Sequence, residues 1–247
     1  AISSLEKFCG KDALKDKSFL DIGCGSGLFS LAALKLGASS ITSIDVDPNS
    51  VACTEKLKEK FGNPANWEVK QNSILDDETV AKLGKFDFVY SWGVLHHTGA
   101  MWKAIDNSMS LVKPNGYYYI AIYNKSDGFN IYPDYRFGNS YMWYLEKKFY
   151  CSLAPAFQKL IDYSVMGLLM FAYAITLQNP IKKIEDHISF RGMNWETDIK
   201  DWLGGYPYEY ATVQEIFQYV QPKGFELINL ISNNGLLNNE FLFKKKD

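Results

Sequence analysis

The stretch that most constrains this chain is residues 19–27, FLDIGCGSG, in which an apolar run breaks into three glycines. An amphipathic pattern follows directly, over residues 28–36, and stops at Gly37. A strand that ends in a glycine turn and feeds a helix leaves backbone N–H groups and a positive dipole end facing the space above it. The stretch therefore predicts a strand, a turn and a helix that together cradle a ligand.

The spacing of these glycines narrows the kind of ligand. Gly23, Gly25 and Gly27 give G-x-G-x-G, whereas the dinucleotide fingerprint needs its third glycine where this chain has Leu28. The next β-branched run, residues 41–46, brings Asp45 about 20 residues past the turn, where a neighbouring parallel strand would deliver a carboxylate to a ribose diol. The pattern disfavours a nicotinamide cofactor but remains consistent with a ligand that contains a nucleoside.

These two motifs resemble those of the class I S-adenosylmethionine-dependent methyltransferases, whose first motif is similar to DIGCGSG and whose second strand ends in such an acid. The resemblance implies S-adenosyl-L-methionine as the cofactor and S-adenosyl-L-homocysteine as the product. It implies that Asp45 holds the ribose hydroxyls, and that the loop at Ser73 and Ile74 meets the adenine through a hydroxyl and a backbone group. The other cofactor-binding residues that it implies are Asp21, Gly23, Cys24, Gly25, Gly27, Val46, Ser91 and Trp92.

The order of the remaining elements predicts the fold class. Further strands are expected at residues 67–71, 86–92 and 117–123, the last after a turn at residues 114–116, and helices at residues 3–14, 47–61, 77–83 and 101–112. Alternating strands and helices imply a parallel sheet covered on both faces. With a terminal antiparallel pair at residues 226–231 and 240–244, we expect a doubly wound, seven-stranded, mostly parallel Rossmann-like sheet.

The alternation stops after the fifth strand. Residues 125–205 are rich in aromatic side chains and contain helical patterns around residues 141–149, 156–177 and 194–203, which we interpret as a helical substrate lid inserted into the core of residues 1–124 and 206–247. The core resumes at Thr212 with a capping box that includes Glu215. The longest apolar run, residues 165–177, is too short for a transmembrane helix, which needs roughly 20 residues. It is interpreted as a buried helix, with a peripheral membrane or lipid-substrate contact as the alternative and a homodimer as a further possibility.

Catalytic and acceptor residues are expected at the ends of the fourth and fifth strands and in the lid. An imidazole suits removal of a hydroxyl proton, so His97, or else His96, is the candidate base, although one ring could instead cap the following turn. No third ligand is spaced to make a metal site with this pair. Candidate substrate-binding residues are Tyr123, Arg191, Tyr206, Tyr208 and Glu209, which could equally form a corner that ties the lid to the core.

Composition limits the possible acceptors. The chain has 26 basic and 28 acidic residues and a net charge of −2, which disfavours a general nucleic-acid binder. Four scattered cysteines are typical of reduced thiols in a cytoplasmic protein, and the start at Ala1 suggests that an N-terminal segment is missing.

The stretch GVLHHTGAMWKAI resembles the small-molecule branch of the family, which includes ubiquinone and menaquinone methylases, although the long aromatic lid departs from the quinone enzymes. We therefore expect a methyltransferase, acting at oxygen on a small molecule or carbohydrate-type metabolite. The alternatives are a tRNA or rRNA methyltransferase and a non-catalytic S-adenosylmethionine-binding regulatory protein.

Overall fold

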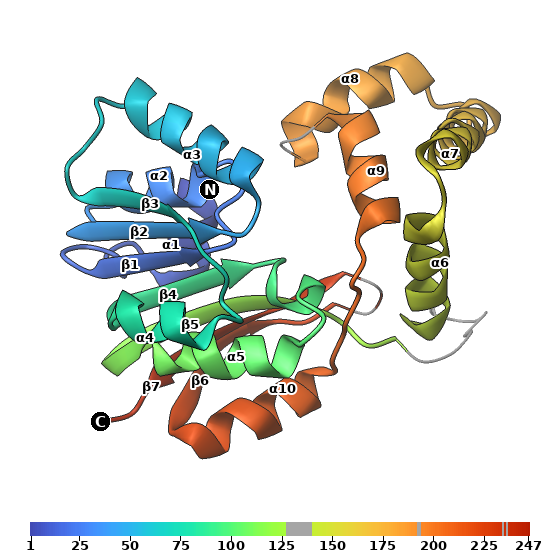
Figure 1. Ribbon diagram of the computed structural model, residues 1–247. Coiled ribbons are helices and arrows are strands. Elements are labelled where there is room, and N and C mark those ends of the chain that lie inside the picture. Colours follow the sequence, from blue (N-terminus) through green and yellow to red (C-terminus); the bar gives the residue numbers. More distant parts are fainter. Residues whose placement is uncertain (127–139, 192–193, 234, 236) are drawn as a thin grey trace. The chain divides into compact units, whose positions relative to one another are not determined.

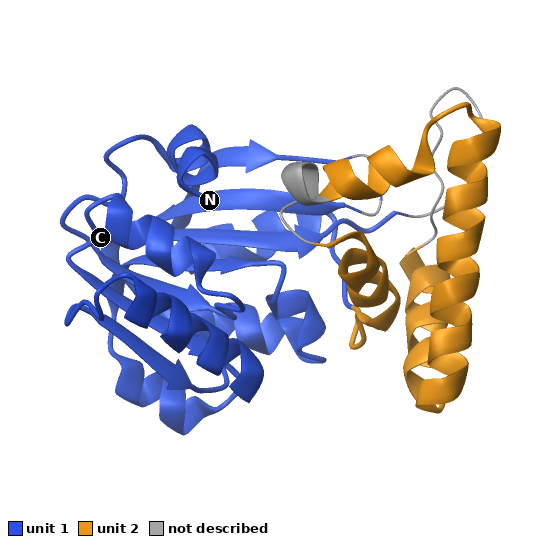
Figure 2. Cartoon of the chain, turned by 90° about the horizontal axis from the view of Figure 1, so that it is seen from above, with its two compact units in different colours: residues 1–138, 209–247 blue, residues 139–208 orange. Residues whose placement is uncertain are grey.

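The computed structural model describes residues 1–126, 140–191, 194–233, 235 and 237–247, without the side chains of residues 188–191. The chain divides into two compact units (Figure 2). Unit 1 comprises Ala1–Gly138 and Glu209–Asp247, and unit 2 comprises Asn139–Tyr208.

Unit 1 is built on a seven-stranded sheet in the order β3-β2-β1-β4-β5-β7-β6 (Figure 1). All neighbours pair in parallel except β7, which runs antiparallel to both β5 and β6. The predicted fold class is confirmed. The strands are β1 (Ser18–Ile22), β2 (Ser40–Asp45), β3 (Trp67–Gln71), β4 (Phe86–Trp92), β5 (Val112–Tyr123), β6 (Phe225–Ile231) and β7 (Asn238–Lys245).

Helices cover both faces of this sheet. One apolar cluster joins the sheet to α1 (Ile2–Cys9) and α2 (Leu28–Lys35), with Phe8, Leu31 and Trp67 among its buried members; Leu57 of α3 (Pro48–Lys60) packs against it. The other cluster joins it to α4 (Asp77–Leu83), α5 (Met101–Ser110) and α10 (Val213–Val220). Two short 3₁₀ helices complete the unit, η1 (Leu95–His97) and η2 (Gln221–Lys223).

Two helix starts follow the capping chemistry of the sequence. The Asp47 carboxylate accepts the N–H groups of Asn49 and Ser50 at the start of α3, where Pro48 occupies the first position. At α10 the predicted capping box is confirmed, because Thr212 and Glu215 exchange side-chain and backbone hydrogen bonds. These caps fix where the two helices leave the sheet.

Two predicted boundaries were wrong. The first helix ends at Cys9 instead of residue 14, because Gly10 has φ 100° and turns the chain out of the helix. The fifth strand begins at Val112, which was assigned to the preceding helix. The expected turn at residues 114–116 lies inside this strand as an irregularity, between the pairs Phe86 with Val112 and Phe88 with Tyr117.

Unit 2 consists of the helices α6 (Ser140–Ser152), α7 (Pro155–Ile175), α8 (Pro180–Arg191) and α9 (Trp195–Gly204). Helix α9 packs against the other three. Sequence analysis missed α8, although Asn179, whose side chain accepts the N–H groups of Ile181 and Lys182, and Pro180 together mark its start.

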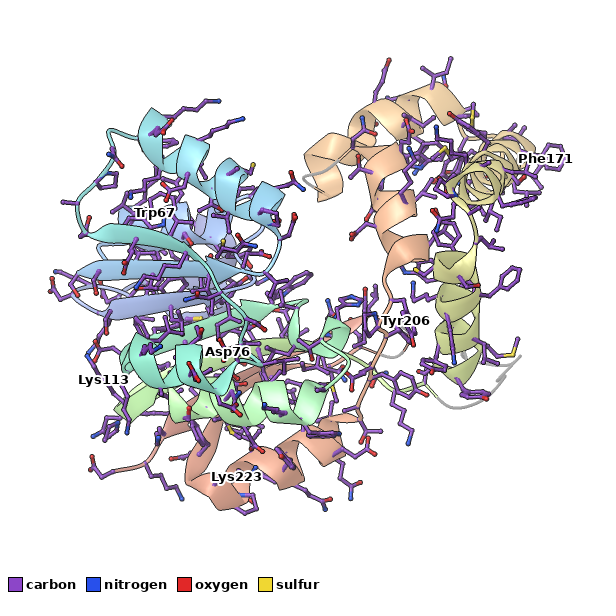
Figure 3. All side chains as sticks on the ribbon, in the orientation of Figure 1. Trp67, Asp76, Lys113, Phe171, Tyr206 and Lys223 are labelled. Carbon is purple, nitrogen blue, oxygen red and sulfur yellow. The ribbon has the colours of Figure 1, made fainter. Side chains whose placement is uncertain are left out.

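The outer side of α7 exposes large apolar side chains, Phe171 among them at 64% exposure (Figure 3). Within the described residues, no single helix is both long and apolar enough to cross a membrane. Only Pro155–Ile175 and Pro180–His187 pass that test together, as a pair bent by 119°.

The chain leaves and re-enters unit 1 at one place in the sheet. Asn124 and Ala211 form a parallel bridge, the Ala211 N–H donates to the Tyr123 carbonyl, and the Lys125 N–H donates to the Ala211 carbonyl. Residues 124 and 125 therefore remain part of the core, and the compact insertion runs from Asn139 to Tyr208 instead of over residues 125–205.

Candidate active site

A pocket of about 430 Å³ lies in unit 1 at the carboxyl ends of β1, β2, β3 and β4. Strand order reverses between β1 and β4, and ligands of open α/β sheets bind at such a switch point. Six residues of the predicted site line this pocket: Gly23, Asp45, Val46, Ser73, Ile74 and His97. The structure therefore brings these six predicted residues together at one cavity.

Four backbone N–H groups of the glycine turn donate hydrogen bonds within the protein. The Gly23 and Cys24 N–H groups both donate to the Ile44 carbonyl, at 2.8 and 3.1 Å, and the Gly27 N–H donates to the Cys24 carbonyl. The Gly25 N–H donates to the Asp45 carboxylate at 2.9 Å. The expectation that the turn N–H groups face the ligand was wrong for these four, because β2 accepts three of the hydrogen bonds and the Cys24 carbonyl accepts the fourth. A phosphate would find these donors already used.

The glycines instead allow close packing around the turn. Gly23 has φ 74°, and a Cβ at this position would lie 2.4 Å from a methyl group of Val94, which forms a wall of the pocket. At Gly27, a Cβ would lie 2.9 Å from the Thr54 side chain, whose hydroxyl donates to the Gly25 carbonyl. At both positions glycine is required for two reasons, because a Cβ would clash with a neighbouring side chain and because φ is positive.

Among the described residues that line the pocket, the acidic one is Asp45. One carboxylate oxygen accepts from Gly25 N–H and the other from Asp47 N–H at 3.0 Å, which fixes the carboxylate at the end of β2. An ionised carboxylate has about four acceptor positions, so two remain for hydroxyl donors of a ligand. This geometry fits a ribose diol.

Asp21 lies beneath the turn, in a buried hydrogen-bonded chain. Its carboxyl accepts from the Ser30 hydroxyl at 2.6 Å, Ser30 lies 2.6 Å from the Ser43 hydroxyl, and the Trp67 indole N–H donates to Ser43 at 2.8 Å. Burial raises the pKa of Asp21 to about 7, with the charge of Asp45 adding to the rise and the Ser30 hydrogen bond opposing it. Asp21 therefore connects the end of β1 to α2 through Ser30, and it is not part of the pocket lining.

This raised pKa gives a prediction for stability against pH. The carboxyl titrates near 3.8 when unfolded and near 7 when folded, so between these values only the folded state keeps the proton and stability falls as pH rises. The loss amounts to roughly 4 kcal/mol. Asp21→Asn should remove this slope. The difference between the free energy of unfolding of the variant and that of the wild type should therefore increase from pH 5 to pH 8.

The measurement is urea unfolding of both proteins at several pH values, with the exposed Asp12→Asn as the control. Asp12→Asn should follow the wild-type curve. Parallel curves for wild type and Asp21→Asn would show that the carboxyl does not carry the buried proton.

Four predicted cofactor residues lie next to the pocket without lining it. The Ser91 hydroxyl is buried and donates to the Ile22 carbonyl at 3.1 Å, joining the ends of β1 and β4. Cys24 is buried and receives a hydrogen bond from Thr54, and Gly25 contributes only through Asp45. Trp92 is 41% exposed at the end of β4.

Sequence reasoning missed other lining residues, among them Asn72, Gly93, Val94 and Thr98. Asn72 directly follows β3, Gly93 and Val94 directly follow β4, and Thr98 follows η1. Gly93 carried a usable signal in the sequence, since a glycine directly after a buried strand marks a turn at the sheet edge. In the structure its φ is 74°. Asn72 and Val94 had no such signal, because their placement depends on the register of distant strands.

The two histidines have different environments. His96 is fully buried, accepts the Tyr123 N–H at Nδ1, and has a Nε2 without a hydrogen-bond partner among the described atoms. Burial, together with the neighbouring His97, holds the pKa of His96 well below its usual value, so the ring is neutral. His97 lines the pocket, with its ring centroid 5.3 Å from that of Tyr123. His97 is thus the imidazole placed to meet a ligand.

The predicted substrate residues belong to both units, with Tyr123 and Glu209 in unit 1 and Tyr206 and Tyr208 in unit 2. Both Glu209 oxygens accept the Met101 N–H, at 3.1 and 3.0 Å, which caps the start of α5, and the Glu209 N–H donates to the His96 carbonyl. Tyr208 is buried and Tyr206 half-exposed in unit 2. The Arg191 side chain lies outside the described residues. Glu209 therefore has a structural task that the sequence did not reveal.

No group of three His, Cys, Asp or Glu side chains that could hold a metal ion occurs in the part of the chain that the structure describes.

Part of this chain is similar to known methyltransferases. A family model described as a methyltransferase domain matches residues 20–118. The ribosomal protein L11 methyltransferase of Haemophilus influenzae (strain PittEE) is 39% identical over 112 residues, which cover 45% of this chain and 35% of that protein. The chain thus matches about a third of the length of this relative.

Solved structures share the fold at low identity. An O-methyltransferase family protein from Burkholderia thailandensis superposes with a TM-score of 0.60 at 13% identity, over 100% of this chain and 55% of the other. The magnesium protoporphyrin IX methyltransferase of Synechocystis PCC 6803, solved with bound S-adenosylhomocysteine, gives a TM-score of 0.55 at 13% identity, over 99% and 80% of the two chains.

Proposed function

We propose that the chain is a class I S-adenosylmethionine-dependent methyltransferase and that it transfers a methyl group to an oxygen of a small-molecule acceptor in the cytoplasm. The match of residues 20–118 to a methyltransferase-domain model supports this proposal. The observation that carries the proposal is the strand-end pocket, in which Asp45 is held with acceptor positions to spare while the turn amides are used internally. A site for a ribose without a phosphate fits S-adenosylmethionine better than a dinucleotide.

S-adenosylmethionine supplies an electrophilic methyl group when bound. The chain's own residues bind and orient it: Asp45 would hold the ribose hydroxyls, and the loop with Ser73 and Ile74 would border the adenine. This loop is itself fixed, because the Ser73 hydroxyl accepts the Leu75 N–H and the Asn107 side chain donates to the Ile74 carbonyl. Such positioning can supply much of the acceleration in a direct displacement.

His97 is the proposed general base, since its ring lines the same pocket. A ring nitrogen of His97 would take the proton of the acceptor hydroxyl as the oxygen is methylated. His96 is unsuited to this step, because it is fully buried and its Nδ1 is engaged by Tyr123. Its ring instead packs beside both His97 and Tyr123, with centroids 4.5 and 4.0 Å away.

Replacement of His97 by alanine should lower turnover about 100-fold, the usual scale for a lost general base. Affinity for S-adenosylhomocysteine should change less than about threefold, because binding rests on Asp45 and the loop walls. Added imidazole should restore part of the turnover of His97→Ala. Full activity of the variant, or a loss that imidazole does not relieve, would remove His97 from this role.

A protein acceptor is the second candidate, favoured by the L11 methyltransferase names of the relatives. RNA is a weaker candidate, because 26 basic residues do not exceed 28 acidic ones. The test uses S-adenosylmethionine labelled at the methyl group with four acceptor pools: a small-molecule extract, ribosomal proteins, tRNA and rRNA.

Label in the small-molecule pool, in a product that mild base does not cleave, supports the O-methyl proposal. Label in ribosomal protein, or in RNA, would replace it. Binding of S-adenosylmethionine without label in any pool would favour a regulatory protein.

A further inference from the structure

Unit 2 contains a pocket of its own, with a volume of about 590 Å³. Its lining comes from α6, α7, α8 and α9, all within Asn139–Tyr208, and shares no residue with the pocket of unit 1. Sites for small molecules commonly enclose about 300 to 1,000 Å³. The size alone is therefore that of a ligand site.

The walls of this pocket are mostly aromatic and aliphatic. Trp143 and Trp202 meet edge to face with ring centroids 4.2 Å apart, and Trp195 and Tyr173 add two more rings. Aromatic faces carry negative electrostatic potential and attract cations as well as apolar groups. The fold already uses this property beside the pocket, where the Lys147 ammonium lies 4.2 Å from the centre of the Trp202 ring.

One carboxyl oxygen in the lining lacks a hydrogen-bond partner among the described residues. Glu146 Oε2 is buried and accepts no hydrogen bond from any described residue. A buried acceptor without a hydrogen-bond donor is unfavourable, so a ligand that donates here binds more tightly. Lys147, its neighbour in sequence, does not fill the role, since its ammonium donates to the Trp202 carbonyl.

The titratable side chains that line the pocket are mostly acidic. Within the described lining, the titratable groups besides Tyr173 are Glu146, Asp198 and His187, and the last two pair at 2.9 Å between Nε2 and Oδ2. Burial raises the pKa of Glu146, which an approaching cation would oppose. Two carboxyl groups, one imidazole and four rings are complementary to a positive head on an apolar body.

We propose that this pocket binds an organic ammonium compound, whose head donates to Glu146 Oε2 and whose ring or short chain lies among the tryptophans. This site is independent of the proposed methyl transfer: it needs neither S-adenosylmethionine nor any residue of unit 1. The two proposals can therefore fail separately.

The experiment titrates the full chain, without S-adenosylmethionine, with three probes that share one chain and differ in head group: octylamine, 1-octanol and octanoate. Isothermal titration gives stoichiometry and affinity, and tryptophan fluorescence reports on the rings of the wall. We expect one saturable octylamine site, with at least tenfold higher affinity than for 1-octanol and weaker binding still of octanoate.

Variants connect the binding to the pocket. Glu146→Gln keeps the shape and removes the charge, so it should lower octylamine affinity about tenfold and leave 1-octanol unchanged. Glu185→Gln, the same change at an exposed position of α8, should have no effect. Leu169→Trp fills the pocket and should abolish saturable binding of octylamine, with circular dichroism confirming its helices.

Three results would overturn the proposal. One is octanoate or 1-octanol binding as tightly as octylamine. Another is an equal effect of Glu146→Gln and Glu185→Gln. The third is binding without saturation that survives Leu169→Trp, which would assign it to the exposed apolar side of α7.

Discussion

Replacement of Asp45 by alanine is expected to lower the affinity for S-adenosylhomocysteine about 100-fold. Each hydrogen bond to a charged group contributes roughly 1.5 to 3 kcal/mol, and about 1.4 kcal/mol corresponds to a tenfold change in affinity. Loss of the carboxylate that binds the ribose diol is therefore expected to give about a 100-fold decrease. The variant also leaves the Gly25 N–H without the Asp45 carboxylate, which accepts its hydrogen bond in the wild type. Isothermal titration of wild type and variant measures the change.

A neighbouring aspartate provides the matched control. Asp47 caps α3 from the same segment and is absent from the pocket lining, so Asp47→Ala should cost some stability and leave the affinity within about threefold. A 3′-deoxy analogue of S-adenosylhomocysteine separates ribose binding from loosening of the turn. Wild type should discriminate against the analogue, and Asp45→Ala should not. Unchanged affinity in Asp45→Ala would disprove the ribose assignment.

Gly23→Ala is expected to lower the free energy of unfolding by about 3 kcal/mol and to abolish detectable binding of S-adenosylhomocysteine. Two costs add: the positive φ of 74° is unfavourable for a side chain, and the new Cβ would lie 2.4 and 2.5 Å from the Val94 methyl groups. Relief requires Val94 to move, and Val94 is a wall of the pocket. Urea unfolding and titration measure the two effects.

Gly25→Ala separates the two costs. Gly25 also has a positive φ, 54°, but a Cβ there has no atom within 4 Å, so this variant should lose only about 1 kcal/mol. Adding Val94→Ala to Gly23→Ala should recover part of the lost stability by removing the nearest methyl groups. Equal destabilisation by Gly23→Ala and Gly25→Ala would mean that the contact with Val94 plays no part.

Local chemistry made much of the core predictable from sequence. The caps at Asp47 and Thr212 depend on side chains that bond within three residues, and both were found. The strand runs were equally clear, because parallel strands are buried on both faces. Asp45 followed from one topological rule, that neighbouring parallel strands end at the same edge.

The errors have long-range causes. The turn amides looked available in sequence, and only the pairing of β1 with β2 shows that the Ile44 carbonyl accepts two of them. Glu209 seemed suited to a substrate, yet it caps a helix that begins 108 residues earlier. The pocket of unit 2 depends on how four helices pack, and no local pattern encodes this arrangement.

The bridge between Asn124 and Ala211 has a consequence for how such a protein can evolve. This bridge holds the two connections to unit 2 side by side in the sheet. The inserted domain can therefore be exchanged as one module. Lengthening a connection costs little, about 0.6 kcal/mol for each doubling, so one ancestral scaffold can accept a new module without rebuilding its nucleoside pocket. Unit 2 can thereby change or be replaced while the strand-end pocket of unit 1 keeps its lining residues.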